Sequence, residues 1–267
     1  MARIAGYGGS VYVGVSTIHA CDIVWDEVAD GDVTETADTT DYKVGTASNK
    51  FVCAAGLANG DIIGSDAITS LDLTACNAVM FWAKCTATTV AGDLQLLLDE
   101  DASCASPLAL DIPVLTANTW RYCKVAATLT DYNATISVGV KLTANDPGAF
   151  TIWLDAIEGA KTIVGIKSWK LDYVFDVQDV TGFDSGGARV YVPTLKGWSG
   201  SFEGYKDGAP LSIGTVVGLE LQESSTATQQ YRGSAIITGQ HAATSVDGLA
   251  TYAYDFQGTH ALEIATA

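Results

Sequence analysis

The sequence predicts an all-β protein in which one β-domain interrupts another. Val, Ile, Thr, Tyr and Trp recur at every second position in short runs, and Gly or Asp-Gly separates these runs. Helical periodicity is nearly absent: only residues 206–213 could hold a short helix, and Gly208 and Pro210 make it a poor one. With 267 residues, of which 48% are apolar and 17% charged, the chain can bury a core.

Composition divides the chain into two parts. Residues 21–163 hold 20 acidic and 7 basic residues, whereas the flanking segments hold 11 and 7. All six cysteines also fall within residues 21–163. The sequence therefore predicts a β-sandwich (jelly-roll) domain at 21–163, inserted into a discontinuous β-domain made of residues 1–20 and 164–267.

Individual strands follow from the alternation of apolar and polar residues. In the discontinuous domain, residues 11–15 form a strand, and residues 169–177 place Trp169, Leu171, Tyr173, Phe175 and Val177 on one face, which we expect to be core. Residues 234–238 and 250–256 flank a turn-rich stretch and predict an antiparallel hairpin. The strands predicted in the inserted domain are 49–53, 78–84, 94–98, 120–125, 136–141 and 150–155.

Charge and motifs exclude several classes of function. The net charge of −17 makes ordinary binding of nucleic acid or anionic lipid unfavourable. No secretory leader pattern and no run of transmembrane length is found, so export and membrane insertion are not expected. The usual motifs of hydrolases, nucleotidases, dehydrogenases and zinc proteases are absent, and the acidic run 99–101 is typical of a solvated loop, so we expect no enzyme.

Metal and ligand sites are predicted only weakly by residue pattern. The cysteine spacings contain no CxxC and the three histidines lie far apart, which argues against zinc, and we expect mostly reduced, buried thiols. No cofactor is expected, apart from a candidate structural calcium. Its candidate ligands are Asp155, Asp22 and Asp26, with ordinary surface carboxylates as the alternative. Trp82, Trp120 and Tyr122, with Trp153, could stack on a sugar, although core packing is the more common role of such residues.

Five short segments, in this order, resemble bacteriophage tail tube (major tail) proteins. They are GYGGSVYVG at 6–14, IKSWKLDY at 166–173, DVTGF at 179–183, GWSGSFEG at 197–204 and VDGLA at 246–250. The resemblance implies a tail-tube-type β-barrel or sandwich that assembles as stacked hexameric rings in the virion tail. It further implies assembly in the host cytoplasm, tape-measure and tail-terminator proteins as partners, and DNA passing through the lumen without specific binding. Asp172, Asp176 and Asp179 would suit a lumen that repels phosphate, and residues 1–9 and 184–189 would order on contact with the next ring.

The inserted segment is similar to carbohydrate-binding-module jelly rolls. The matching pieces are Trp25, GTASNKF at 45–51, LDLT at 71–74, VMFW at 79–82, TW at 119–120 and LDAI at 154–157. This resemblance implies a structural calcium near Asp155, and the resemblance to tail tube proteins implies that the insert is an outward-facing accessory domain. The function predicted is thus a structural, non-enzymatic tail tube subunit. The alternative is a protein that binds a host-surface carbohydrate on a β-domain mount, and a glycan-active enzyme is the third reading.

Overall fold

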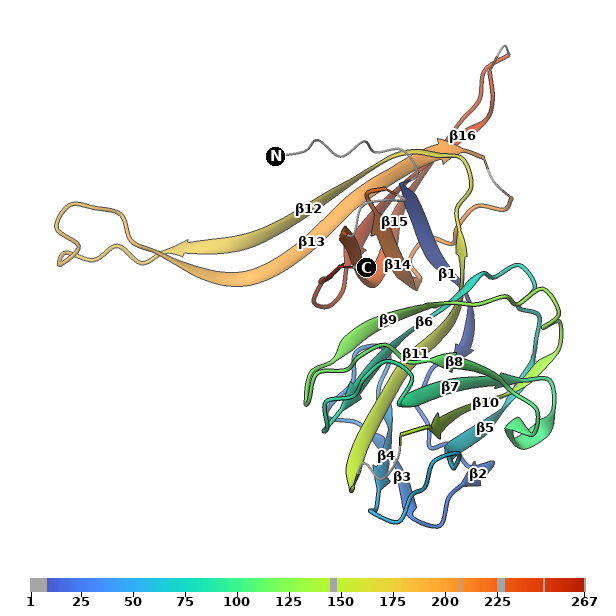
Figure 1. Ribbon diagram of the computed structural model, residues 1–267. Helices are drawn as coiled ribbons and strands as arrows, with labels where there is room; N and C mark the ends of the chain where they lie inside the picture. The colour runs from blue at the N-terminus through green and yellow to red at the C-terminus, as the bar shows by residue number, and fades with distance from the viewer. Residues whose placement is uncertain (1–8, 145–147, 207, 225–228, 247, 267) are drawn as a thin grey trace. The chain divides into compact units, whose positions relative to one another are not determined.

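The computed structural model confirms the all-β prediction (Figure 1). It describes residues 9–144, 148–206, 208–224, 229–246 and 248–266. Within these ranges it contains 17 strands and one short 3₁₀ helix, Ala102–Cys104. The described part of residues 206–213 forms no helix, as Gly208 and Pro210 lead one to expect.

The chain divides into two compact units. Met1–Tyr12 and Ile163–Ala267 form the first, called here the discontinuous unit, and Val13–Thr162 form the second, called the inserted unit. The divisions fall at Tyr12/Val13 and Thr162/Ile163, whereas the sequence prediction placed them at 20/21 and 163/164. Strand β1 (Ser10–His19) begins in the first unit and ends in the second.

The inserted unit is a sandwich of two antiparallel sheets. One has the order β2-β5-β10-β7-β8 and the other the order β3-β4-β11-β6-β9, with β1 also beside β11. The first sheet comprises β2 (Val28–Ala29), β5 (Ile62–Leu71), β10 (Thr135–Leu142), β7 (Leu94–Asp99) and β8 (Leu108–Asp111). The second comprises β3 (Val33–Asp38), β4 (Ser48–Cys53), β11 (Phe150–Thr162), β6 (Ala78–Cys85) and β9 (Arg121–Ala126).

The core of the inserted unit lies between these two sheets. Phe51, Phe81 and Ile152 of one sheet belong to the same buried cluster as Leu96 and Val138 of the other. Alternate residues of each strand enter this cluster, as the period of two predicts. All strands predicted for this segment are confirmed, with boundaries shifted by one to seven residues.

The discontinuous unit is an antiparallel sheet in the order β12-β13-β16-β15-β14-β1. A short last strand pairs with the beginning of β15. The predicted hairpin is confirmed as β15 and β16. The strands are β12 (Ile166–Asp179), β13 (Tyr191–Tyr205), β14 (Val216–Gln222), β15 (Gln229–Ala243), β16 (Thr251–Gly258) and β17 (Glu263–Thr266).

The core of the discontinuous unit is built around Trp198. Its indole N–H donates to the carbonyl of His260 at 2.7 Å, and its ring packs on Phe256. A side chain at Gly258 would overlap this indole, so glycine is required there. Glu220 and Arg232, partners on β14 and β15, form a buried ion pair with 2.7 Å between carboxylate and guanidinium.

Candidate functional site

The first candidate site is a hairpin arm, defined here as residues 173–197 of β12, β13 and their connecting loop. Strand β13 pairs with β16 only from Ser199 to Tyr205, so beyond that point β12 and β13 pair only with each other. Figure 1 shows the two strands extending away from the rest of the unit's sheet. Gly186 and Gly187 both adopt positive φ in the connecting loop, which other residues adopt only with strain.

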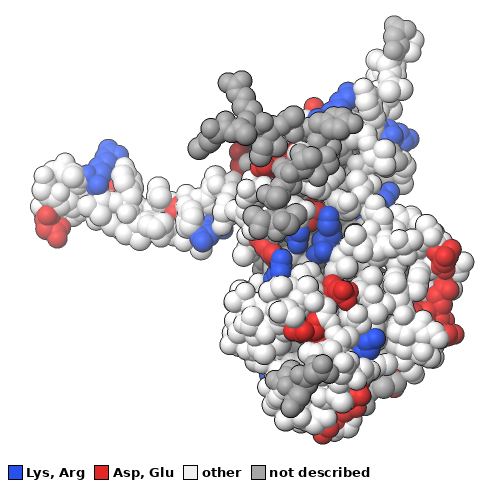
Figure 2. All heavy atoms as spheres, viewed as in Figure 1, with Lys and Arg blue, Asp and Glu red and all other residues white. Residues whose placement is uncertain are grey.

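The arm exposes an unusual amount of apolar surface. Of the 24 exposed large apolar side chains in the described part of the chain, ten lie in the arm. Phe183, in the connecting loop, has no covered surface, and much of the arm visible in Figure 2 is uncharged. The ten are Tyr173, Val174, Phe175, Val177, Val180, Phe183, Val190, Tyr191, Val192 and Leu195.

The expectation that one face of 169–177 is core is wrong for the distal half of that strand. Trp169 is half-buried, packs on Tyr231 and donates to the carbonyl of Gln222. Phe175 and Val177 are exposed by 51% and 61%. The physical reason is that, among the described residues, no third strand pairs with the arm and its apolar side chains stay exposed.

Charges on the arm are few and exposed. Within the arm the Lys196 ammonium lies 4.9 Å from the centre of the Phe175 ring, and just before the arm's first residue Asp172 pairs with Lys170 at 2.7 Å. Asp179 accepts hydrogen bonds from the backbone and hydroxyl of Thr181, and these bonds lower the pKa of Asp179. Asp172, Asp176 and Asp179, the aspartates that would suit a phosphate-repelling lumen, are all solvent-accessible on β12.

The second candidate site is a pair of carboxylates in the inserted unit, Asp22 and Asp155. Asp155 Oδ2 accepts from the backbone N–H groups of Lys43 and Val44 at 2.6 and 2.9 Å. Asp22 Oδ1 accepts from the N–H groups of Thr46 and Ala47. The two carboxylates thus both accept hydrogen bonds from the backbone of one loop, 43–47.

Asp155 fits the chemistry of a hard cation. Its side chain is fully buried, and its second oxygen, Oδ1, has no hydrogen-bond partner among the described residues. Burial raises the pKa of Asp155 to about 7, which a bound cation would reverse. Within the described ranges no three His, Cys, Asp or Glu side chains are placed to hold a metal ion, so backbone or water oxygens would have to complete the shell.

Asp26, the third predicted ligand, lies in another cluster of the inserted unit. Its N–H donates to Asp66 Oδ1. His19 Nδ1 accepts from two donors, the Cys21 N–H and the Trp25 indole, so its Nε2–H donates to Asp66 Oδ2 at 2.9 Å. Desolvation lowers the pKa of His19, consistent with a neutral ring.

Glu35 stands beside this cluster and was not predicted. Both of its carboxylate oxygens are buried without a hydrogen-bond partner in the described structure. Burial, reinforced by the charges of Asp66 and Asp26, raises the pKa of Glu35 to about 8. Gly64 leaves the space that the Glu35 carboxyl occupies.

The predicted aromatic residues gather on the outer face of the second sheet. Trp82 and Tyr122 are register partners on β6 and β9, with ring centres 4.9 Å apart. Both are buried, as is Trp153, whereas Trp120 is half-buried. Only Trp120 therefore keeps a substantial ring surface for stacking.

Three lysines and two aspartates cover these aromatic rings. The Lys43 ammonium lies 5.9 and 5.7 Å from the ring centres of Trp82 and Trp120. Asp41 accepts from the Trp120 indole at 2.6 Å and pairs with Lys84. The Lys50 ammonium lies over the Trp153 ring, and Asp38 accepts a hydrogen bond from the Trp153 indole N–H. Although burial acts the other way, hydrogen bonds from Lys84 and Trp120 lower the pKa of Asp41.

All six cysteines are buried, and none of them forms a disulfide bond in the described part of the chain. Burial raises the pKa of Cys53 to about 12 and that of Cys104 to about 11, so these thiols are poor nucleophiles at neutral pH. No helix in the described ranges is long and apolar enough to cross a membrane.

These features define an all-β protein with an exposed two-stranded arm and an inserted β-sandwich. No known family matches its sequence, and no curated protein matches it significantly. Among solved structures, a chain from the tail of an empty GTA particle with C6 symmetry is 20% identical, with a TM-score of 0.35 over 40% of this chain and 87% of that one. A chain from the virion of a native gene transfer agent is 21% identical, with a TM-score of 0.35 over 40% of this chain and 89% of that one.

A different structure aligns with the whole chain. The N-terminal CBM22-1-CBM22-2 tandem domain of Xyn10C from Paenibacillus barcinonensis is 12% identical, with a TM-score of 0.37 over 100% of this chain and 88% of that one.

Proposed function

We propose that this protein is a structural, non-enzymatic subunit of a phage-type tail tube, assembled from copies of itself. The carrying observation is the arm, whose apolar side chains no other part of the described chain covers. A two-stranded hairpin alone is marginally stable in water, and an apolar patch of this kind usually marks an interface. The arm is therefore proposed to be covered by a neighbouring subunit.

The edges of the arm support a repeating contact between copies. β12 ends the sheet, so its outer backbone groups are free to pair with another strand. A patch on one copy that binds a different patch on the next generates a ring when the rotation closes. We propose hexameric rings that stack into a tube in the virion tail, built in the host cytoplasm and bounded by tape-measure and tail-terminator proteins.

DNA is proposed to pass through the lumen of the tube without binding to it. The discontinuous unit has an excess of acidic residues, and Asp172, Asp176 and Asp179 are solvent-accessible on β12. Like charges on a lumen surface would repel phosphate, which lets DNA slide. Residues 1–8, proposed to act in ring contacts together with Gly9, lie outside the described residues.

The test compares a double serine variant of the arm, at Val177 and Leu195, with a single control variant at Val164. Val177 lies in the arm and Val164 in the same unit outside it, with exposures of 61% and 66%. We expect wild type and Val164→Ser to form rings or tubes in negative-stain electron microscopy and to gain mass with concentration in light scattering. Val177→Ser, combined with Leu195→Ser, should remain monomeric with an unchanged circular dichroism spectrum.

Two outcomes would contradict the proposal. One is a wild-type chain that stays monomeric at every concentration, also when a tail initiator complex is added. The other is a double arm variant that assembles as well as Val164→Ser, because the arm would then not be the contact.

A second candidate function is recognition of a host-surface glycan by the inserted unit. The half-buried Trp120 ring is the observation that favours it, since sugars stack on accessible aromatic faces. Trp120→Ala should then abolish binding on a glycan array while Trp169→Ala, in the other unit, leaves it intact. Binding that survives Trp120→Ala would remove this surface from consideration.

A structural calcium is proposed at Asp22 and Asp155. When bound, the ion would neutralise the buried Asp155 carboxylate and fix the loop 43–47 between the two aspartates. Calcium should raise the unfolding temperature of wild type and leave that of Asp155→Asn unchanged. An equal shift in both, or none in wild type, would contradict the site.

A further inference from the structure

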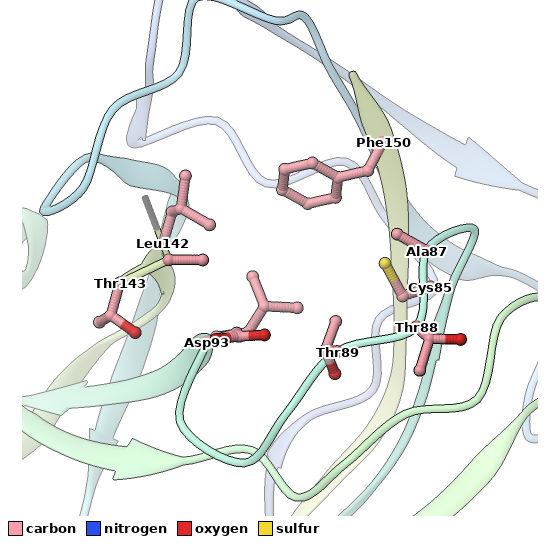
Figure 3. A pocket seen from close by; sticks show the side chains of 10 residues that line it. Cys85, Ala87, Thr88, Thr89, Asp93, Leu142, Thr143 and Phe150 are labelled. Carbon is pink, nitrogen blue, oxygen red and sulfur yellow. The ribbon is translucent and has the colours of Figure 1, made fainter. Parts of the chain in front are cut away.

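A cleft of about 460 Å³ in the inserted unit offers few groups to a ligand (Figure 3). The hydroxyls of Thr88 and Thr89 accept hydrogen bonds from backbone N–H groups outside the cleft and point away from it. Among its apolar lining residues, Leu94, Leu142 and Phe150 are almost fully buried. The arm of the discontinuous unit, by contrast, exposes ten large apolar side chains and the edges of both its strands.

The arm has two open edges. β13 pairs with β16 only from Ser199 onwards, and no strand of the described chain pairs with the outer side of β12. Because β12 and β13 are antiparallel, the β12 edge of one arm and the β13 edge of another can continue the same antiparallel order. A ring of arms joined in this way leaves neither edge open. Pro193 is the one residue of β13 within the arm that lacks a backbone N–H, so it interrupts such a ladder at one point at most.

The charges of the arm are divided between its two sides. The outgoing side, residues 173–182, contains Asp176 and Asp179 and no basic residue, whereas the returning side, residues 188–197, contains Arg189 and Lys196 and no acidic residue. All four side chains are exposed. Figure 2 shows acidic and basic groups along the arm with uncharged surface between them. The outgoing side of one arm is therefore complementary in charge to the returning side of another.

The two sides also match in the position of their charges. Lys196 lies level with Asp176, because it is the register partner of the preceding residue of β12. Near the tip, Asp179 is the register partner of Tyr191, whose hydroxyl accepts a hydrogen bond from Arg189 at 3.2 Å. Each side thus has one charge near the base and one near the tip. Two arms that lie side by side without a shift bring each acid close to a base of the neighbour.

Within a single chain these charges are not neutralised. Among the described residues, Asp176, Arg189 and Lys196 form no ion pair. Just before the arm, in contrast, Lys170 and Asp172 pair with each other at 2.7 Å. The part of β12 that projects as the arm therefore keeps its charges available for a second molecule.

We infer that the β12 edge of each arm pairs with the β13 edge of the arm of the next copy, and that the opposite charges fix this order. The inference deepens the proposed function and rests on it, because the partner is a second copy of this chain. Each copy uses one edge for one neighbour and the other edge for the other neighbour, so the contact can close into a ring. Two β12 edges in contact would instead bring four aspartates together, which like charge disfavours.

The experiment uses two charge-reversed variants of the full chain. The acid-reversed variant is Asp176→Lys with Asp179→Lys, and the base-reversed variant is Arg189→Glu with Lys196→Glu. Alone, each variant brings like charges together at every contact of the ring. We expect each to need a roughly tenfold or higher concentration than wild type to assemble at low ionic strength. Light scattering and negative-stain electron microscopy measure assembly, and circular dichroism checks the fold.

Mixing the two variants is the decisive step. When they alternate around a ring, opposite charges meet at every contact, so an equal mixture should assemble at the wild-type concentration. A single chain that carries all four substitutions should assemble alone for the same reason. The matched control is Asp72→Lys with Asp131→Lys, at exposed positions of the inserted unit. Asp72 accepts hydrogen bonds from the backbone and hydroxyl of the threonine two residues on, as Asp179 does, and this control should assemble like wild type.

The outcomes separate the edge contact from the proposed function. Assembly of the mixture, with neither variant assembling alone, supports the inference. A base-reversed variant that assembles like wild type overturns it, because the β13 edge would then lie outside the contact. A mixture that fails to assemble while wild type succeeds overturns the pairing and leaves the tube subunit intact. A wild-type chain that never assembles overturns both.

Discussion

Strands β10 of the inserted unit and β12 of the discontinuous unit share an alternating pattern but have opposite surroundings. β10 pairs with β5 on one side and β7 on the other, and all but two of its residues are buried. β12 has one neighbour, and its last eight residues are all exposed. Alternation shows that one face of a strand needs cover, but not whether the cover comes from the same chain. A substitution at a side chain that its own chain covers should therefore lower the free energy of unfolding, whereas one at an uncovered side chain should not.

The largest effect is expected in the core of the sandwich. Phe51→Ala removes a fully buried ring and should lower the free energy of unfolding by about 3–5 kcal/mol. Phe175→Ala in the arm should change it by less than about 0.5 kcal/mol. Urea denaturation at a concentration where the protein is monomeric measures both, and equal losses would mean that the arm is covered within one chain.

The second-largest loss in the free energy of unfolding is expected at the buried ion pair of the discontinuous unit. Glu220→Gln leaves the Arg232 guanidinium without a counter-charge in the core, at an expected cost of about 3 kcal/mol. Replacing both residues by leucine should restore most of this loss. If Glu220→Gln unfolds like wild type, water reaches Arg232 and the pair is not buried in solution.

Glu35 should give the inserted unit a dependence on pH. Its pKa is raised from 4.5 to about 8, so between these values the unfolded chain releases a proton that the folded protein keeps. The free energy of unfolding therefore falls as pH rises through this interval. Glu35→Gln should flatten the fall, whereas Glu100→Gln, at an exposed carboxylate of the same unit, should reproduce the wild-type profile.

The smallest effect is expected at the base of the arm. Lys170 and Asp172 form an exposed pair, which contributes little against solvent and salt. Asp172→Asn should change the free energy of unfolding by less than about 0.5 kcal/mol. A loss comparable to that of Glu220→Gln would show that this pair is covered in solution.

Local pattern predicted ten of the 17 described strands, because their alternation lies within a few consecutive residues, and missed seven, among them β5, β13 and β14. It was insufficient for Tyr173, Phe175 and Val177, since their exposure depends on the absence of a third strand. Glu35 carried no signal either: in a Thr-Glu-Thr run it resembles a solvent-facing residue, and only the sheet opposite makes it buried.

The candidate sites were also only partly predictable, because their contacts come from segments far apart in the sequence. Asp22 and Asp155, predicted together as calcium ligands, both accept hydrogen bonds from one loop, while the calcium site itself stays a prediction. Asp26 lies four residues from Asp22 but bonds to Asp66. The Lys43 ammonium lies over the Trp82 ring. Lys43 belongs to a loop, and in a loop the sequence has no period from which the direction of a side chain could be predicted.

The points at which the chain leaves and re-enters the discontinuous unit are held together. The N–H of Ile163 donates to the carbonyl of Val11 at 2.9 Å, across the 150 residues of the inserted unit. A folded insert keeps its two ends near each other, whereas an unfolded one is a long flexible loop whose closure would cost roughly 4 kcal/mol of chain entropy. Folding of the insert thus stabilises its host through the connectivity of the chain, and the two units are thermodynamically coupled in this way.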